Sequence, residues 1–126
     1  MYKICLIGGG GFIGSILRYL VGIGVQRFFA PQAFPLGTLC VNIIGCFFIG
    51  LLNGLANGRI QFSEEARGFF FIGLLGGFTT FSSFAFETYT LARTQHLAFS
   101  LANIAVQIVF GLAAVWLGHV TARSFL

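Results

Sequence analysis

Long stretches without a charged residue constrain this sequence more than any other feature. Residues 28–58, 68–86 and 97–118 contain no Asp, Glu, Lys or Arg, and residues 4–26 contain only Arg18. A helix needs about 20 apolar residues to cross the hydrocarbon core of a bilayer. Charged residues make up 8% of the 126-residue chain, against about 25% in an ordinary soluble domain. We therefore expect one all-α membrane domain, residues 1–126, with four transmembrane helices at about 4–26, 36–57, 68–92 and 97–118.

The remaining charges and motifs argue against two other classes of protein. The positive charges are spaced singly along the chain, without the basic run that is typical of a nucleic-acid partner. Gly9-x-Gly11-x-x-Gly14 lacks the βαβ unit and the acidic residue that a dinucleotide site needs. Neither Ser82 nor Ser83 stands in the Gly-x-Ser-x-Gly elbow of a hydrolase. We expect neither an enzyme nor nucleic-acid binding.

The third predicted helix contains the run Gly76-Gly77-Phe78-Thr79-Thr80 near its middle. Two glycines and two β-branched threonines weaken a helix. Backbone groups that are freed there need partners, because lipid offers no hydrogen bonds. One interpretation is a kink that a neighbouring helix fills. The other, which we favour, is a helix broken at mid-membrane depth that presents its backbone groups to an ion.

Small and polar residues recur on single helix faces. In the first helix a stripe with a spacing of four residues consists of Gly10, Gly14, Arg18 and Gly22. Most glycines in a stripe of this kind allow close packing of a neighbouring helix. The amides of Asn42, Asn103 and Gln107 are different, because an unpaired amide in hydrocarbon costs on the order of 1 to several kcal/mol. They indicate a polar path inside the membrane.

The positive charges give almost no preference for one orientation in the membrane. With four spans, one side carries Lys3, Arg59, Arg67 and Arg123, and the other carries Arg18, Arg27 and Arg93. Because the Lys and Arg asymmetry sets orientation, this near balance permits insertion both ways up. Four helices of this size cannot enclose a pore alone. An antiparallel homodimer is therefore the natural completion.

Three segments resemble the signatures of a known membrane family. They are residues 10–19 (GGFIGSILRY), residues 37–45 (GTLCVNIIG) and residues 73–84 (GLLGGFTTFSSF). In this order they are similar to the CrcB/Fluc fluoride channel family, and the similarity extends over the whole chain. The Gly-Gly-x-Thr-Thr-Phe-Ser-x-Phe string in a third span is the most specific of the three.

The resemblance implies an antiparallel, dual-topology homodimer in the bacterial plasma (inner) membrane, with two fluoride pores and a structural Na⁺ on its two-fold axis. The pore residues of the family correspond here to Phe81, Phe84 and Asn42, and its vestibule arginine to Arg18. Its sodium-binding carbonyls correspond to Gly76 and Thr79. Further residues expected beside the ion path are Thr38, Ser82, Ser83 and Glu87. Asn103 and Gln107 stand where the family often has a Tyr and Ser track, and both can still donate hydrogen bonds.

The function that the resemblance implies is passive, fluoride-selective export that lowers cytoplasmic fluoride. Two other functions stay open. One is a small dual-topology, proton-coupled multidrug antiporter, although such a carrier needs a carboxylate in its first span and residues 4–26 contain none. The other is a non-transporting membrane assembly subunit whose glycines only pack helices.

Overall fold

Four long helical segments make up the protein. The structure is a computed structural model and describes residues 1–29, 34–58 and 60–125. Three segments are continuous helices, α1 (Tyr2–Phe29), α2 (Leu36–Ala56) and α6 (Leu97–Arg123). The third in chain order consists of α3 (Glu64–Arg67), the π-helix η1 (Gly68–Leu75), α4 (Gly76–Phe78) and α5 (Phe81–Thr94). All four segments are long and apolar enough to cross a membrane, which confirms the predicted all-α, four-span architecture.

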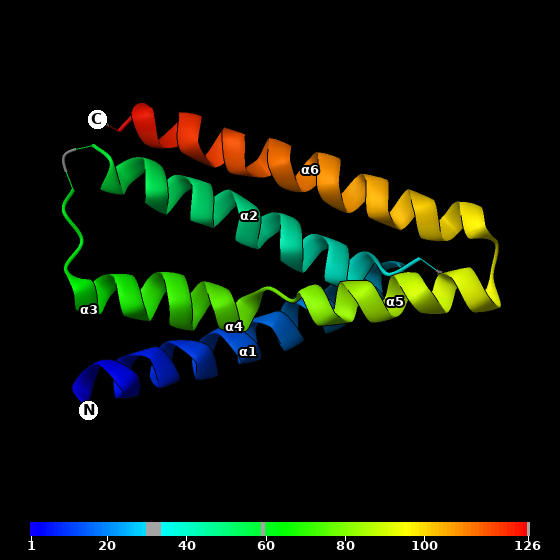
Figure 1. The fold of residues 1–126 in the computed structure, drawn as a ribbon, viewed down its shortest axis with the longest axis horizontal. Coiled ribbons are helices and arrows are strands. Elements are labelled where there is room, and N and C mark those ends of the chain that lie inside the picture. The colour runs from blue at the N-terminus through cyan, green and yellow to red at the C-terminus, as the bar shows by residue number, and fades with distance from the viewer. Residues whose placement is uncertain (30–33, 59, 126) are drawn as a thin grey trace.

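The segments alternate in direction, as Figure 1 shows. Both termini lie at one end of the molecule, together with the end of α2 and the start of α3, and the turn from α5 to α6 lies at the other end. This arrangement agrees with the loop sides that the charge count assumed. Arg59 and the predicted loop residues 30–33 lie outside the described residues.

Glycines bring α1 into direct backbone contact with the third segment. A Cβ atom at Gly10 would lie 2.5 Å from Phe69 O, and one at Gly14 would lie 2.1 Å from Leu74 O. Gly77 makes the reciprocal contact, since its Cβ would lie 2.6 Å from Gly11 O. Association of helices in lipid depends on this close approach of small residues. The stripe at Gly10 and Gly14 is therefore a packing surface.

A second glycine seam joins α2 to α6. A Cβ atom at Gly50 would lie 2.1 Å from Val115 O, and one at Gly118 would lie 2.0 Å from Phe47 O. The two seams hold α1 on η1 and α4, and α2 on α6, with almost no side-chain volume between the backbones.

The third helix is broken, but at a slightly different place than the glycines suggested. Gly76 and Gly77 are helical in α4, whereas Thr79 (φ −81°, ψ 161°) and Thr80 (φ −152°, ψ 115°) are extended. Extended backbone suits β-branched threonine. Gly77 is explained by its contact with α1, so of the four residues expected to weaken the helix, the two threonines form the break. The segment before the break is the π-helix η1, a rare form that is frequently found at functional sites.

Polar contacts fix the start of the third segment. Ser63 is the N-cap of α3, and its Oγ accepts from the N–H of Ala66 at 3.2 Å. Lys3 forms an ion pair with Glu64, which connects the beginning of α1 to α3. Because both side chains are exposed, this pair adds little stability.

The glycine seam gives a direct test of the packing. Gly10→Ala should lower the free energy of unfolding by about 1–3 kcal/mol, because a methyl group would push apart two backbones that cannot move independently. Gly8→Ala, two residues away, has nothing within 4 Å of the new Cβ and should cause no loss. Thermal unfolding of both purified variants in detergent compares them. Equal stability of the two would refute the seam.

Candidate functional site

Asn42 of α2 pairs with the backbone of Thr80 at the break in the third helix. The N–H of Thr80 donates to Asn42 Oδ1 at 2.9 Å, and Asn42 Nδ2 donates to the carbonyl of Thr80 at 3.2 Å. One side-chain amide thus satisfies both polar backbone groups of a buried, non-helical residue. Thr80 was not singled out from the sequence as a site residue, because nothing in the sequence pairs it with an amide 38 positions earlier.

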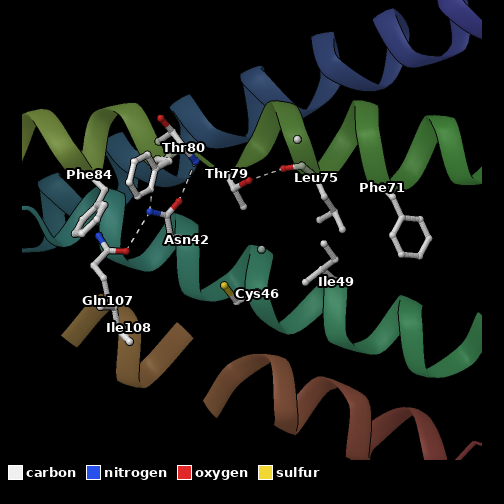
Figure 2. Close-up of a pocket in the computed structure, with 13 residues that line it drawn as sticks. Asn42, Cys46, Ile49, Phe71, Leu75, Thr79, Thr80, Phe84, Gln107 and Ile108 are labelled. Atoms are coloured by element: carbon white, nitrogen blue, oxygen red, sulfur yellow. Dashed lines mark hydrogen bonds between the residues drawn. The ribbon is translucent and has the colours of Figure 1, made fainter. Parts of the chain in front are cut away.

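Asn42 also reaches α6. Its Nδ2 donates a second hydrogen bond to Gln107 Oε1 at 3.1 Å. Asn42 therefore connects three segments of the fold at one level, as the dashed lines in Figure 2 show. Both of its N–H groups are engaged within the chain.

These residues line a groove beside the break, which we call the Asn42 groove and which has a volume of about 410 Å³. The lining combines the amides of Asn42 and Gln107 with the break and with apolar side chains; its members are Asn42, Gly45, Cys46, Ile49, Phe71, Leu75, Gly76, Thr79, Thr80, Phe81, Phe84, Gln107 and Ile108 (Figure 2). Six of the residues expected at the ion path or the metal site, Asn42, Phe81, Phe84, Gln107, Gly76 and Thr79, are thus brought together. The groove is open on the side of Phe81, whose surface is 78% exposed.

The first turn of α5 places two aromatic rings in this groove. Phe81 and Phe84 stand three residues apart, with ring centroids 5.5 Å apart and planes inclined by 59°. Thr80 is the N-cap, and its Oγ1 accepts from the N–H of Ser83 at 3.2 Å. Ser82 and Ser83 contact the same hydroxyl through their Oγ atoms, at 3.2 and 3.1 Å. The two serines therefore fix the cap beside the groove.

The carbonyls of Gly76 and Thr79 lose the partners that an unbroken α-helix would give them. Those partners are the N–H groups of Thr80 and Ser83, four residues further on. In this structure the N–H of Thr80 donates to Asn42 Oδ1, and that of Ser83 donates to Thr80 Oγ1. The carbonyl of Gly76, at the start of α4, and that of Thr79, in the break, thus lack their helical donors. The carbonyl of Thr79 accepts only a long hydrogen bond, from Arg18 Nη1 at 3.4 Å, among the hydrogen bonds of the described residues.

Arg18 lies on the opposite side of the break, in a second pocket of about 140 Å³. Its Nη1 donates a long hydrogen bond to the carbonyl of Thr79 at 3.4 Å. Polar residues that share this pocket, the Arg18 pocket, are Gln26, Thr38, Thr80 and Ser83. Thr80 lines both spaces, so the break separates an amide-lined groove from a guanidinium-lined pocket.

Glu87 follows Phe84 by three residues on α5, slightly less than one helical turn. The hydroxyl of Thr38 donates to Glu87 Oε1 at 2.6 Å, which joins α2 to α5. The other carboxylate oxygen, Oε2, is buried without a hydrogen-bond partner among the described residues. Thr38 thus connects the Arg18 pocket to this carboxylate.

Asn103 lies apart from the residues of the groove. It is completely buried between α5 and α6, where its Nδ2 donates to Thr88 Oγ1 at 2.8 Å. Ser100 adds a hydrogen bond to the carbonyl of Thr88 at 2.9 Å. Asn103 was expected beside the ion path on the basis of its position in the fourth span. In the structure, the hydrogen bond of Asn103 to Thr88 holds α6 against α5.

The described residues offer no cluster of three or more His, Cys, Asp or Glu side chains that could hold a metal ion. Of the three free cysteines, Cys46 lines the Asn42 groove. It lies one helical turn after Asn42, a spacing from which its place in the groove could have been inferred.

Comparisons with known proteins identify the family. The model of the family described as "CrcB-like protein, Camphor Resistance (CrcB)" matches residues 5–119. A curated relative from Methanosarcina acetivorans, "Fluoride-specific ion channel FluC 1", is 48% identical over 98% of this chain and 93% of its own length. "Fluoride-specific ion channel FluC" from Agrobacterium fabrum is 45% identical over 98% of both chains. A protein of that name from Methylobacillus flagellatus is 45% identical over 94% of this chain and 92% of its own.

These matches confirm the resemblance that the three sequence motifs indicated. The chain belongs to the CrcB family, and with four apolar helices of spanning length it is a multi-pass integral membrane protein.

Proposed function

We propose that this protein is a fluoride-selective ion channel that allows passive fluoride export and so lowers cytoplasmic fluoride. The observation that carries the proposal is the Asn42 groove, in which a buried amide and two phenylalanine rings meet at a break in a membrane helix. Curated relatives with 45–48% identity carry the name of fluoride-specific ion channels. We place the channel in the bacterial plasma (inner) membrane.

The groove has the chemistry that a small, strongly hydrated anion requires. A pore must replace lost water with hydrogen-bond donors, and amide and hydroxyl groups supply them here. The edge of an aromatic ring is electropositive, so the adjacent Phe81 and Phe84 can turn ring edges toward a partly dehydrated anion. The break also directs the N-terminal, positive end of α5 at the groove.

The carrier alternative finds less support. A proton-coupled antiporter needs a carboxylate in its first span, and α1 contains neither Asp nor Glu. A purely structural subunit would have no use for polar groups in a groove between membrane helices, because they are costly to bury there.

Flux measurements test the channel proposal. Purified protein in liposomes should release fluoride rapidly, without a proton gradient, as recorded by a fluoride electrode. Phe84→Ile retains apolar volume but removes the ring edge, so it should lower fluoride flux by roughly 3- to 10-fold. Phe125→Ile, at an exposed phenylalanine beyond α6, is the control and should conduct normally. Proton-dependent exchange would favour the antiporter, and absence of flux in the unmodified protein would favour the assembly subunit.

The open groove also supports the proposed antiparallel homodimer. In a single chain the groove would open to lipid on the side at which Phe81 is exposed, beside the amides of Asn42 and Gln107. A second copy would cover this side and complete the walls of the pathway. The near balance of Lys and Arg between the two sides of the chain allows the copies to have opposite orientations.

Cysteine labelling tests the orientation. Gln61→Cys places a thiol in the exposed segment before α3, in a chain whose three native cysteines have been replaced by alanine. In intact cells, an impermeant maleimide should label about half of the chains, and permeabilisation should expose the rest, since both orientations occur. Labelling from one side only would overturn the antiparallel arrangement.

We further propose that the carbonyls of Gly76 and Thr79 from both copies hold a structural Na⁺ on the two-fold axis. The loss of their helical N–H donors to Asn42 and to the cap of α5 supports this assignment. Neutral oxygen ligands without a carboxylate suit a monovalent cation better than Mg²⁺ or Ca²⁺. Threonine hydroxyls from the other copy are the rival donors, but the hydroxyl of Thr79 already donates to Leu75 O at 2.9 Å.

Sodium removal tests this assignment. Protein purified in a large organic cation should lose activity or dimer stability, and both should return on titration with Na⁺ but not with Mg²⁺. If activity and dimer stability do not change over the whole Na⁺ titration, the proposed Na⁺ site is refuted. The two carbonyls would then be satisfied by hydrogen bonds alone.

A further inference from the structure

A further space, of about 510 Å³, lies between α1, α2 and the third segment. We call it the apolar cavity, because every side chain that lines it belongs to Leu, Ile, Val or Phe. Its walls include Leu17 and Val21 of α1, Phe48 and Leu52 of α2, and Leu75 and Phe78 of the third segment. The volume is roughly three times that of an engineered cavity of about 150 Å³ that binds benzene. The apolar cavity can therefore hold a hydrocarbon of more than six carbon atoms.

The apolar cavity lies between the two pairs of helices that the glycine seams hold together. One pair is α1 with η1 and α4, and the other is α2 with α6 (Figure 1). The pairs meet where α1 approaches α2, since a Cβ atom at Gly37 would lie 3.4 Å from Gly22 O. Beyond that contact, large side chains such as Leu17 and Phe48 stand between the two helices and leave the cavity unfilled.

The apolar cavity and the Asn42 groove lie on different faces of α2. Asn42 and Cys46 line the groove, whereas Ile44 and Phe48 line the cavity. Helical spacing turns the two sets apart by roughly a third of the circumference of α2. The second copy proposed above would cover the side on which Phe81 is exposed, and Phe81 is not part of the cavity lining. We therefore expect lipid, and not the second copy, at the mouth of the cavity.

The apolar cavity has an accessible rim and a closed floor. Leu17 and Phe48 at the rim are 42% and 46% exposed, whereas Leu75 and Phe78 are 6% and 7% exposed. Water does not fill a space of this kind, because apolar cavities stay dry. An empty space would forfeit the dispersion contacts of its walls. The surrounding medium of four membrane-spanning segments is hydrocarbon, which restores those contacts by entering from the rim.

We propose that the apolar cavity is a binding site for one acyl chain of a membrane lipid, which reaches Leu75 and Phe78. Leu75 lines both the apolar cavity and the Asn42 groove. Its carbonyl accepts from the N–H and from the hydroxyl of Thr79, both at 2.9 Å. The acyl chain thus packs against the residue that receives the last helical hydrogen bond before the break. The proposal does not depend on which ion the protein conducts.

Photo-cross-linking in liposomes tests the site in the unmodified protein. The probe is a phosphatidylcholine with a diazirine near the end of one acyl chain, and mass spectrometry of peptides locates the cross-links. Lipid on the general surface labels residues according to their exposure, which favours residues such as Leu112 of α6, at 68%. A chain inside the cavity should instead label Leu75 and Phe78 at least as strongly as Leu112. Labelling of Leu112 without labelling of Leu75 and Phe78 would overturn the proposal.

A variant that obstructs the cavity provides the second test. Leu52→Trp places an indole in the apolar cavity and should lower the cross-link yield at Phe78 by roughly 3-fold or more, because the larger side chain takes the contacts of the acyl chain. Leu112→Trp is the matched control, outside the cavity, and should leave the yield at Phe78 unchanged. An unchanged yield in Leu52→Trp would refute entry of the chain. If Leu52→Trp does not fold, the cross-link map of the unmodified protein still decides. Fluoride flux is measured separately, so failure of the lipid site leaves the proposed function standing.

Discussion

Backbone N–H and C=O groups find no partners in lipid, and the third helix frees several of them at Thr79 and Thr80. The amide of Asn42 meets this constraint by pairing with both groups of Thr80. The rest of the site depends on that pairing. It leaves the N-terminal end of α5 beside the groove, and it takes the Thr80 N–H that would otherwise donate to the carbonyl of Gly76. The second N–H of Asn42 Nδ2 is then able to donate to Gln107 Oε1.

The fold forms its polar site where the packing partners change. Glycine contacts hold α1 on η1 and α4, before the break, and hydrogen bonds from α6 hold α5 after it. Helix α2 runs past both halves, as Figure 1 shows. Its residue Asn42 contacts Thr80, which lies between them. The backbones in the seams touch directly, and the Asn42 groove lies where the third segment loses its helical geometry.

Much of this architecture could be predicted from the sequence, because uncharged apolar stretches of this length are typical of transmembrane helices. The break was also predicted, although the glycine at position 77 serves helix contact and the threonines supply the extended backbone. Six residues that the resemblance led us to expect at the ion path or the metal site line one groove. It could not give the hydrogen-bond partners, since the pairing of Asn42 with Thr80 joins residues far apart in sequence and leaves no periodic signal. For the same reason Asn103, which looks equivalent to Gln107, could not be assigned to the contact with Thr88.

The order of these contacts along the chain has a consequence for biosynthesis. Chains emerge from the ribosome N-terminus first. Asn42 is therefore already in the membrane when Thr80 arrives, so the break is covered as soon as the third segment inserts. Gln107 follows with the last helix and is turned by an amide that is already fixed. A nascent chain thus covers the break before α6 arrives, and a product truncated before α6 has a satisfied break but lacks the contact of Asn42 with Gln107.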